Sequence, residues 1–200
     1  MSPDQTKPYE QLYTAPEDTP IFVDVPEQKI ISISGKGDPN STAAYGETAE
    51  ALFPVAAAIQ AACQKLGHGF TVMPFEGFLW TDDMGIFSIL NKNLWKWETF
   101  IVQPDFVTAE IFAAALEEAE KNTHLPLLKR IEFKTIHEGR CVQIMRLGPP
   151  NKMAPTVAKL RDFVEASNLR PVGKHHIIYL NDKRKVAPED LKTIIRQPIA

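Results

Sequence analysis

The sequence places one carboxylate among aromatic side chains. Residues 70–80 are mostly apolar and predict a strand, whose side chains alternate between two sides. Because every second side chain points to the same side, Glu76 shares a side with Phe78 and Trp80. Burial there would disfavour the charged carboxylate, which suits a general acid/base or a group that recognises a cation. Because Glu76 stands next to Gly77, a solvated position at the strand end is the alternative.

Tryptophans gather nearby. Trp80, Trp95 and Trp97 lie within eighteen residues, and Trp95 and Trp97 share one side of a second predicted strand, residues 95–103. Such indoles can form an aromatic wall for a flat ligand, although core packing would also use them. With neighbouring Phe75, they are candidate ligand-binding residues.

A third group is polar. On a predicted strand over residues 175–181, His175 shares a side with Ile177 and Tyr179, whereas His176 faces the other way. No further ligands at metal-site spacing accompany the histidines, and no nucleophile elbow is present. The stretch Gly35-Lys36-Gly37 lacks the long spacing of a phosphate loop. We therefore expect neither a metal ion nor a cofactor.

The composition limits the kinds of partner that the protein is expected to bind. The 200 residues are 44% hydrophobic and 24% charged, with a net charge of −3, which gives no footprint for nucleic acid. No apolar run is long enough to span a bilayer, and the first residues lack the features of a signal peptide. The two cysteines, Cys63 and Cys141, suit a reduced setting. We expect a cytoplasmic protein with no nucleic acid or membrane contact.

The chain contains an internal repeat. Residues 23–40 align without gaps on residues 134–151, and residues 98–104 align on residues 192–198 in the same order. Two matches in one order indicate a duplicated module, and two copies predict pseudo-twofold packing with a ligand cleft at the seam.

The elements follow this repeat. In module one we expect strands at residues 29–37, 70–80 and 95–103, and a helix over 43–66 that kinks or restarts at Pro54. A helix over 108–122, N-capped by Thr108, links the modules. In module two we expect strands at 130–136 and 140–147 joined as a hairpin, a helix at 154–167, and strands at 175–181 and 191–197.

This order predicts an α+β fold: two tandem strand-helix-strand-strand modules, with an antiparallel sheet, helices on one face and a concave opposite face free to bind a ligand. The expected boundaries are a flexible arm over residues 1–20 and a single domain over 21–200. Within that domain, module one spans 21–104, the linker helix 105–125 and module two 126–200.

Several motifs together resemble the GyrI-like small-molecule-binding family. The stretches that carry the resemblance, over about residues 9–199, are GKGDPN (35–40), VMPFEG (72–77), QPDFVT (103–108), EGRCVQIM (138–145), GKHH (173–176) and IRQP (195–198). The resemblance implies two modules around a ligand cleft. It also implies a stand-alone protein, because no DNA-binding helix-turn-helix is present. Some members of the family hydrolyse the cyclopropane of DNA-alkylating natural products and so protect the cell.

Departures from the family pattern make the expected cleft more apolar. Ile177 stands where the resemblance implies a central glutamate, Phe53 and Ala57 stand where tyrosines are common, and Pro150 replaces a tyrosine. We therefore expect the protein to capture a hydrophobic aromatic compound, neutral rather than cationic. The alternative is an enzyme of the same family, for example a hydrolase that opens cyclopropane rings.

Two residues are the candidates for catalysis, Glu76 and Tyr179. The candidate ligand-binding residues are Phe75, Glu76, Trp80, Trp95, Trp97, Met145, His175, Ile177 and Tyr179. Of these we expect Glu76, Trp80, Trp97, Met145, Ile177 and Tyr179 to line one cavity.

Overall fold

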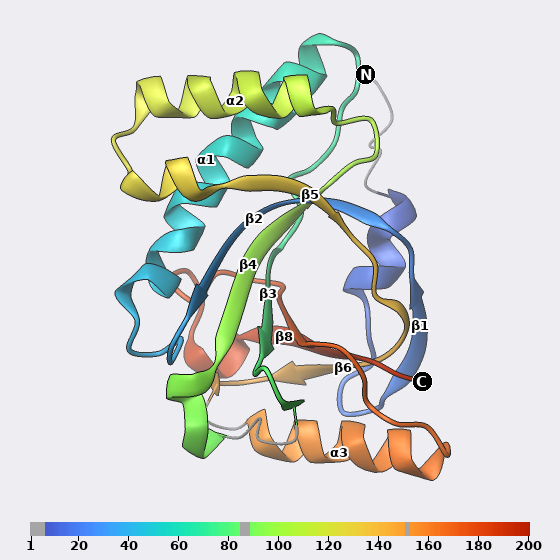
Figure 1. Ribbon diagram of the computed structural model, residues 1–200. Coiled ribbons are helices and arrows are strands. Elements are labelled where there is room, and N and C mark those ends of the chain that lie inside the picture. The colour runs from blue at the N-terminus through green and yellow to red at the C-terminus, as the bar shows by residue number, and fades with distance from the viewer. Residues whose placement is uncertain (1–6, 85–88, 151–152) are drawn as a thin grey trace. The chain divides into compact units, whose positions relative to one another are not determined.

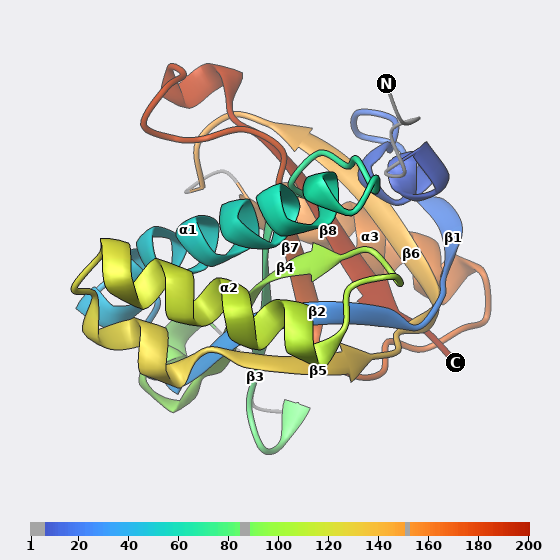
Figure 2. The same cartoon turned by 90° about the horizontal axis from the view of Figure 1, so that it is seen from above.

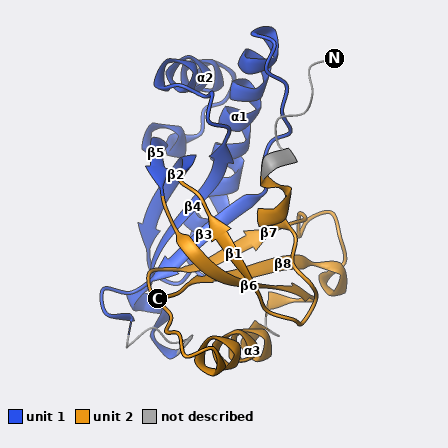
Figure 3. Cartoon of the chain, turned by 90° about the vertical axis from the view of Figure 1, so that its right-hand side faces the viewer, with its two compact units in different colours: residues 1–8, 28–136 blue, residues 9–27, 137–200 orange. Residues whose placement is uncertain are grey.

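The chain folds into two compact units (Figure 3). Unit 1 comprises residues 1–8 and 28–136, and unit 2 comprises residues 9–27 and 137–200. The computed structural model describes residues 7–84, 89–150 and 153–200, so Asn151 of the sequence repeat lies outside the described residues.

Unit 1 is an antiparallel sheet covered by helices (Figure 1). Its strands are β2 (Gln28–Lys36), β3 (Phe75–Trp80), β4 (Lys96–Gln103) and β5 (Glu132–Ile136), and their spatial order is β5-β2-β4-β3. Helix α1 (Ala43–Lys65) packs on β2 and β4, and α2 (Ala109–Asn122) lies beside α1 (Figure 2). Two short 3-10 helices, η3 (Ile89–Leu94) and η4 (Pro126–Arg130), complete the unit.

Helix α1 buries one continuous stripe. Its buried residues recur at helical spacing: Thr48, Ala51, Leu52, Val55, Ala56, Ile59 and Cys63. The helix continues through Pro54 and does not restart there, which corrects one part of the expectation. In α2 the predicted N-cap is confirmed, because the Thr108 hydroxyl accepts a hydrogen bond from the Ile111 N–H at 3.3 Å.

Unit 2 has the same plan. Its strands are β1 (Ile21–Val25), β6 (Gly139–Leu147), β7 (His175–Tyr179) and β8 (Lys192–Pro198), in the order β1-β6-β8-β7. Helix α3 (Met153–Ala166) packs on β6, where Leu160 and Val164 bury Val142, Ile144 and Ile195. The unit also contains the 3-10 helix η6 (Pro188–Asp190).

Strands β1 and β5 each pair with a strand that is distant in the sequence. Strand β1 precedes β2 in the chain but pairs with β6, and β5 precedes β6 but pairs with β2. The expected hairpin between residues 130–136 and 140–147 is therefore wrong. Gly139, at φ 69°, starts β6, whose residues 139–143 pair with β1 instead.

The duplication is visible in both units. Each unit has a strand-helix-strand-strand segment, whose strands are β2, β3 and β4 in unit 1 and β6, β7 and β8 in unit 2. In both units an added strand, β5 or β1, pairs with the first strand of the segment, and the third strand lies between the first and the second. The strand order is therefore the same in both. Gly37 and Gly148 are matched by the sequence repeat and adopt nearly the same conformation, at φ 103° and 100°. This is the left-handed region that glycine favours. The expected α+β class, antiparallel strands and module order are confirmed.

Residues 9–20 cover the helix-free face of unit 2. They include most of the 3-10 helix η1 (Lys7–Tyr13), in which Leu12 packs against Val25 and Cys141. Ala15 packs against Ile178 and Ile194. This part of the expected loose arm is therefore folded onto the sheet, and in unit 2 the face opposite α3 is not free for a ligand. None of the helices in the described ranges is long and apolar enough to cross a lipid bilayer.

One close contact fixes the sheet of unit 1. Gly35 of β2 is the cross-strand partner of Trp97 of β4, and the Trp97 indole lies directly over it. An added Cβ at Gly35 would lie 2.2 Å from the indole Cζ2 atom, well inside van der Waals contact. Because Trp97 is fully buried, its ring has little room to move away.

We expect Gly35→Ala to lower the free energy of unfolding by about 1–3 kcal/mol through overpacking against Trp97. Gly46→Ala is the matched control. Gly46 lies in α1 with nothing within 4 Å of an added Cβ, so this change should stabilise the protein by about 0.5–1 kcal/mol. Urea denaturation followed by tryptophan fluorescence measures both. Equal stabilities of Gly35→Ala and the wild type would contradict the packing described.

Candidate functional site

Cross-strand register decides which side chains share a face in unit 1. Phe75 is paired with Ile101, Gly77 with Thr99 and Leu79 with Trp97. These residues lie on the face that α1 covers, because Phe53 and Tyr45 of α1 contact Phe75 and Trp97. Glu76, Phe78 and Trp80 alternate with them and lie on the opposite, helix-free face.

Four aromatic side chains between α1 and the sheet form a candidate ligand site, which we call the ring surface: Tyr45, Phe53, Phe75 and Trp97. Phe53 and Phe75 have ring centroids 6.3 Å apart, and Tyr45 meets Trp97 edge-on at 5.2 Å. Phe53 is 38% exposed although it is large and apolar, and Tyr45 and Phe75 are half-buried. Phe53, Tyr45 and Phe75 can therefore stack on a flat ligand, whereas Trp97 is fully buried and contacts Tyr45.

Gly77 forms part of the floor of the ring surface. It stands between Phe75 and Leu79 on β3, and a Cβ built on it would lie 3.1 Å from the Tyr45 hydroxyl oxygen. The Tyr45 hydroxyl therefore lies directly over a strand position without a side chain. This arrangement presents one polar group among aromatic carbons, as specific small-molecule sites do.

Glu76 lies away from the ring surface. It is buried on the helix-free face of β3 and shares that face with Phe78 and Phe100, whose rings are 4.7 Å apart. The expected aromatic neighbours are therefore present. Glu98 is a second buried carboxylate on the same face, and it forms an ion pair with Lys134. The thickness of the sheet separates both carboxylates from Phe53, Tyr45 and Trp97.

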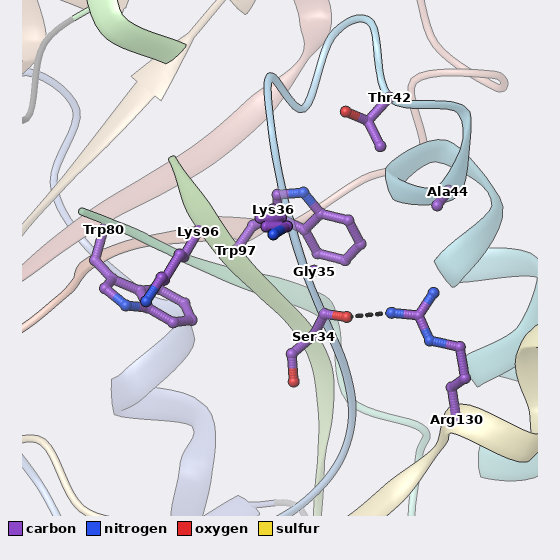
Figure 4. Close-up of a pocket in the computed structure, with 9 residues that line it drawn as sticks. All are labelled: Ser34, Gly35, Lys36, Thr42, Ala44, Trp80, Lys96, Trp97 and Arg130. Atoms are coloured by element: carbon purple, nitrogen blue, oxygen red, sulfur yellow. Dashed lines mark hydrogen bonds between the residues drawn. The ribbon is translucent and has the colours of Figure 1, made fainter. Parts of the chain in front are cut away.

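The tryptophans do not form one wall. Trp80 is the cross-strand partner of Lys96 and lies on the helix-free face, whereas Trp97 packs under α1. The sequence predicts that both line one cavity between the modules, and in unit 1 their side chains leave the sheet on opposite faces. They approach a common hollow only at the end of the sheet (Figure 4). Trp95 is buried, with the Lys92 ammonium 5.8 Å from its ring centre.

In unit 2 the candidate residues also divide between two faces. Ile177 is paired with Ile195, so it lies on the α3 face together with His175 and Tyr179. Met145 is paired with Ile194 and packs with Ala15 on the opposite face. The prediction that Met145 lines the same cavity as Ile177 and Tyr179 is wrong, because a sheet lies between them.

Sequence reasoning missed a buried ionic network in unit 2. The guanidinium of Arg196 donates to Glu138 at 3.3 Å, to Gln143 at 3.0 Å and to the carbonyl of Leu12. The His176 Nδ1 atom lies 3.0 Å from the same Glu138 oxygen. These residues are far apart in sequence, so no spacing pattern could have indicated the network.

Charge pairing controls the ionisation of this network. Burial alone would raise the pKa of Glu138, but the charges and hydrogen bonds of His176 and Arg196 hold that pKa below its usual value. The network also fixes the chain near η1, since Gln143 donates to the carbonyl of Thr14 at 2.9 Å. We assign it a structural role. His175 differs, because burial, aided by the charges of His176 and Arg161, lowers its pKa to about 4.

Comparison with known proteins gives the same fold over the whole chain. An uncharacterised conserved protein from Listeria innocua is 35% identical, with a TM-score of 0.87, covering 98% of this chain and 99% of its own. A hydrolase from the same organism is also 35% identical, with a TM-score of 0.81 and 98% of each chain covered. The C-terminal domain of EcmrR shares the fold at 15% identity and a TM-score of 0.56, covering 91% of this chain and 97% of its own. No curated protein matches the chain.

The model of the GyrI-like small molecule binding domain matches residues 93–200, which is more than half of the chain. The chain belongs to this GyrI-like family. The matched region of the GyrI-like domain includes β4 with Trp97 and all of β6, α3, β7 and β8. The resemblance seen in the sequence motifs is thereby confirmed.

His175 gives this GyrI-like domain a stability that depends on pH. Its pKa is near 4 in the folded protein and about 6.5 for an unperturbed histidine, so the unfolded chain takes up the proton first as pH falls. Stability is therefore lost as pH falls below 6.5. We expect the free energy of unfolding to drop by about 2 kcal/mol between pH 7 and pH 5.

The measurement is urea denaturation at both pH values. His175→Gln should remove most of the drop, whereas His124→Gln, which changes an exposed histidine, should retain it. A full drop in His175→Gln would show that other groups cause the pH dependence.

Proposed function

We propose that this GyrI-like protein binds a neutral, flat, aromatic small molecule on the ring surface of unit 1. The observation that carries the proposal is the exposure of Phe53, whose ring centroid lies 6.3 Å from that of Phe75 on the face of β3 that α1 covers. A ligand stacked on the exposed part of the Phe53 ring would remove that apolar surface from water, which favours binding.

The charge of the site supports a neutral ligand. None of the four rings of the ring surface carries a charge at neutral pH, and the buried carboxylates Glu76 and Glu98 lie on the opposite face of the sheet. In unit 2, Ile177 is an apolar residue on the face that α3 covers, at the position where the family resemblance implies a glutamate. A cation would therefore find no carboxylate among these side chains to offset the loss of its hydration.

We expect Phe53→Ala to weaken the binding of Nile red, a neutral dye, by roughly three- to tenfold, because one stacking face is lost. Gly77→Ala should weaken it too, since the new methyl group displaces the Tyr45 hydroxyl. Dye fluorescence during titration measures both. Phe22→Ala is the matched control: Phe22 is 42% exposed and lies in unit 2, so its loss should leave the affinity unchanged. If Phe53→Ala bound the dye as the wild type does, the ring surface would not be the site.

Hydrolysis is the second candidate function. The observation that favours it is the 35% identity, over nearly the whole chain, to a Listeria innocua protein named as a hydrolase. The family resemblance adds a reaction, hydrolytic ring opening of a cyclopropane, and we consider it for a cyclopropane fused to a dienone, whose carbonyl can accept the electron pair. Water would form a C–O bond to a cyclopropane carbon, the strained C–C bond would break, and its electron pair would pass to the dienone oxygen. The water oxygen would lose a proton and remain on that carbon as a hydroxyl group, while the former dienone oxygen would take up a proton and become a phenol.

Tyr45 is the residue of the ring surface that could assist this step, because its hydroxyl can donate a hydrogen bond to the oxygen as negative charge develops. Tyr179 lies on the α3 face of unit 2 and remains a second candidate. Glu76 is a weaker one, since it lies on the other face of β3 from the rings.

The reaction can be followed by the loss of dienone absorbance when a spirocyclopropane-dienone alkylator is mixed with the protein. If the protein is a hydrolase, Tyr45→Phe should slow the reaction about ten- to a hundredfold, in the range of one lost stabilising donor or proton transfer. Tyr9→Phe is a control that changes a tyrosine packed near Leu12. Decay at the buffer rate with wild-type protein would exclude this reaction and leave binding as the function.

A further inference from the structure

A second site lies at the end of the unit 1 sheet, where β2 and β3 finish and β4 begins. A hollow of about 490 Å³ opens there (Figure 4). Its described lining residues are Ser34, Gly35, Lys36, Thr42, Ala44, Trp80, Lys96, Trp97 and Arg130. Three of these nine are cationic and none is anionic, so the hollow is basic although the whole chain has a net charge of −3.

At the end of the sheet, the last cross-strand pairs of β2, β4 and β3 form one row of side chains, which places two lysines next to each other. Lys36 is the direct cross-strand partner of Lys96, and Lys96 is the partner of Trp80. The three side chains therefore project from one face, in the order Lys36, Lys96, Trp80. Like charges directly opposite each other destabilise a strand pair, since their Cβ atoms are only about 5 Å apart. An anion between the two ammonium groups would turn this repulsion into attraction.

The partners already present leave room for an anion. Lys96 forms an ion pair with Asp82, but the Asp82 side chain is 83% exposed, and an ion pair this open to solvent contributes little. Arg130 uses one N–H to bind the carbonyl of Ser34, beyond the point where β5 stops pairing with β2 at Ser32. The other guanidinium N–H groups of Arg130 are donors available to an acceptor, because its side chain is exposed.

The hollow also has a buried donor in its lining, on the α1 side of the sheet end. The Nε1–H group of Trp97, whose indole lies against Gly35 in this lining, is buried and has no hydrogen-bond partner among the residues that the structure describes. A buried donor of this kind is costly unless an acceptor satisfies it. Lys36, Lys96, Arg130 and Trp97 can only donate, so the chemistry of the hollow selects an acceptor-only, negatively charged group.

We propose that this hollow binds an aromatic carboxylate, with the carboxylate held by Lys36, Lys96 and Arg130 and the ring lying on Trp80. The row order sets this orientation, because Trp80 follows the two lysines across the face at successive strand positions. The site differs from the ring surface in its charge and in the side chains that would bind the ligand's ring. A ligand at one site leaves Phe53 and Phe75 of the other untouched.

The test uses the full chain and two matched probes, naphthalene-carboxylate and its neutral amide, titrated by calorimetry in low and high salt. The carboxylate should bind at least about tenfold more tightly than the amide, and added salt should reduce this difference. Lys36→Gln and Arg130→Gln should each weaken carboxylate binding about five- to tenfold. Trp80→Leu should weaken binding of both probes.

Two further variants separate this site from a general attraction of anions to surface lysines. Asp82→Asn should tighten carboxylate binding, because Lys96 loses its competing partner. Lys129→Gln removes an equal charge from the same 3-10 helix as Arg130, at a position outside the hollow, and should have no effect. Equal affinities for the two probes, or equal losses in Lys129→Gln and Arg130→Gln, would overturn the proposal. Loss of carboxylate binding in Phe53→Ala would place the ligand on the ring surface instead.

Discussion

The register between β2, β4 and β3 is the constraint on which both candidate sites depend. It places Trp97 opposite Gly35, and the indole occupies the space that any larger residue at position 35 would fill. The same register places Gly77 on the α1 face of β3, where the Tyr45 hydroxyl lies over it. At the end of the sheet it aligns Lys36, Lys96 and Trp80 in one row. A shift of the register by one residue would move each set of side chains to the opposite face, so both candidate sites depend on the same register.

The two units use buried polar groups differently. In unit 2, Arg196, Glu138, Gln143 and His176 bond to one another and to carbonyls of residues 11–14, and this network holds a segment over the helix-free face. In unit 1, the α1 side of the sheet combines aromatic rings with the hydroxyl of Tyr45, and the sheet end carries cations. The buried network of unit 2 therefore holds that segment in place, whereas the side chains that we propose to bind ligands lie in unit 1.

The sequence was sufficient for properties that depend on one segment. Alternation along a single strand correctly placed Glu76 with Phe78 and Trp80, and Trp97 with Thr99. The repeat correctly indicated two units with the same strand order. What failed was the relation between strands. The alternation of side chains along β3 and along β4 does not show whether Trp80 and Trp97 lie on the same face of the sheet. That depends on the register between the two strands, which are not adjacent in the sequence.

The exchange of β1 and β5 has a consequence for how the chain folds. Each edge strand leaves its neighbour in sequence and pairs with a strand from the other end of the chain, so β1 meets β6 only after all of unit 1 has been synthesised. Closing so long a loop costs chain entropy before any hydrogen bond is gained, which delays these contacts. During translation, β2 would therefore have an unpaired edge until β5 emerges. That interval is when a nascent chain is most exposed to wrong partners.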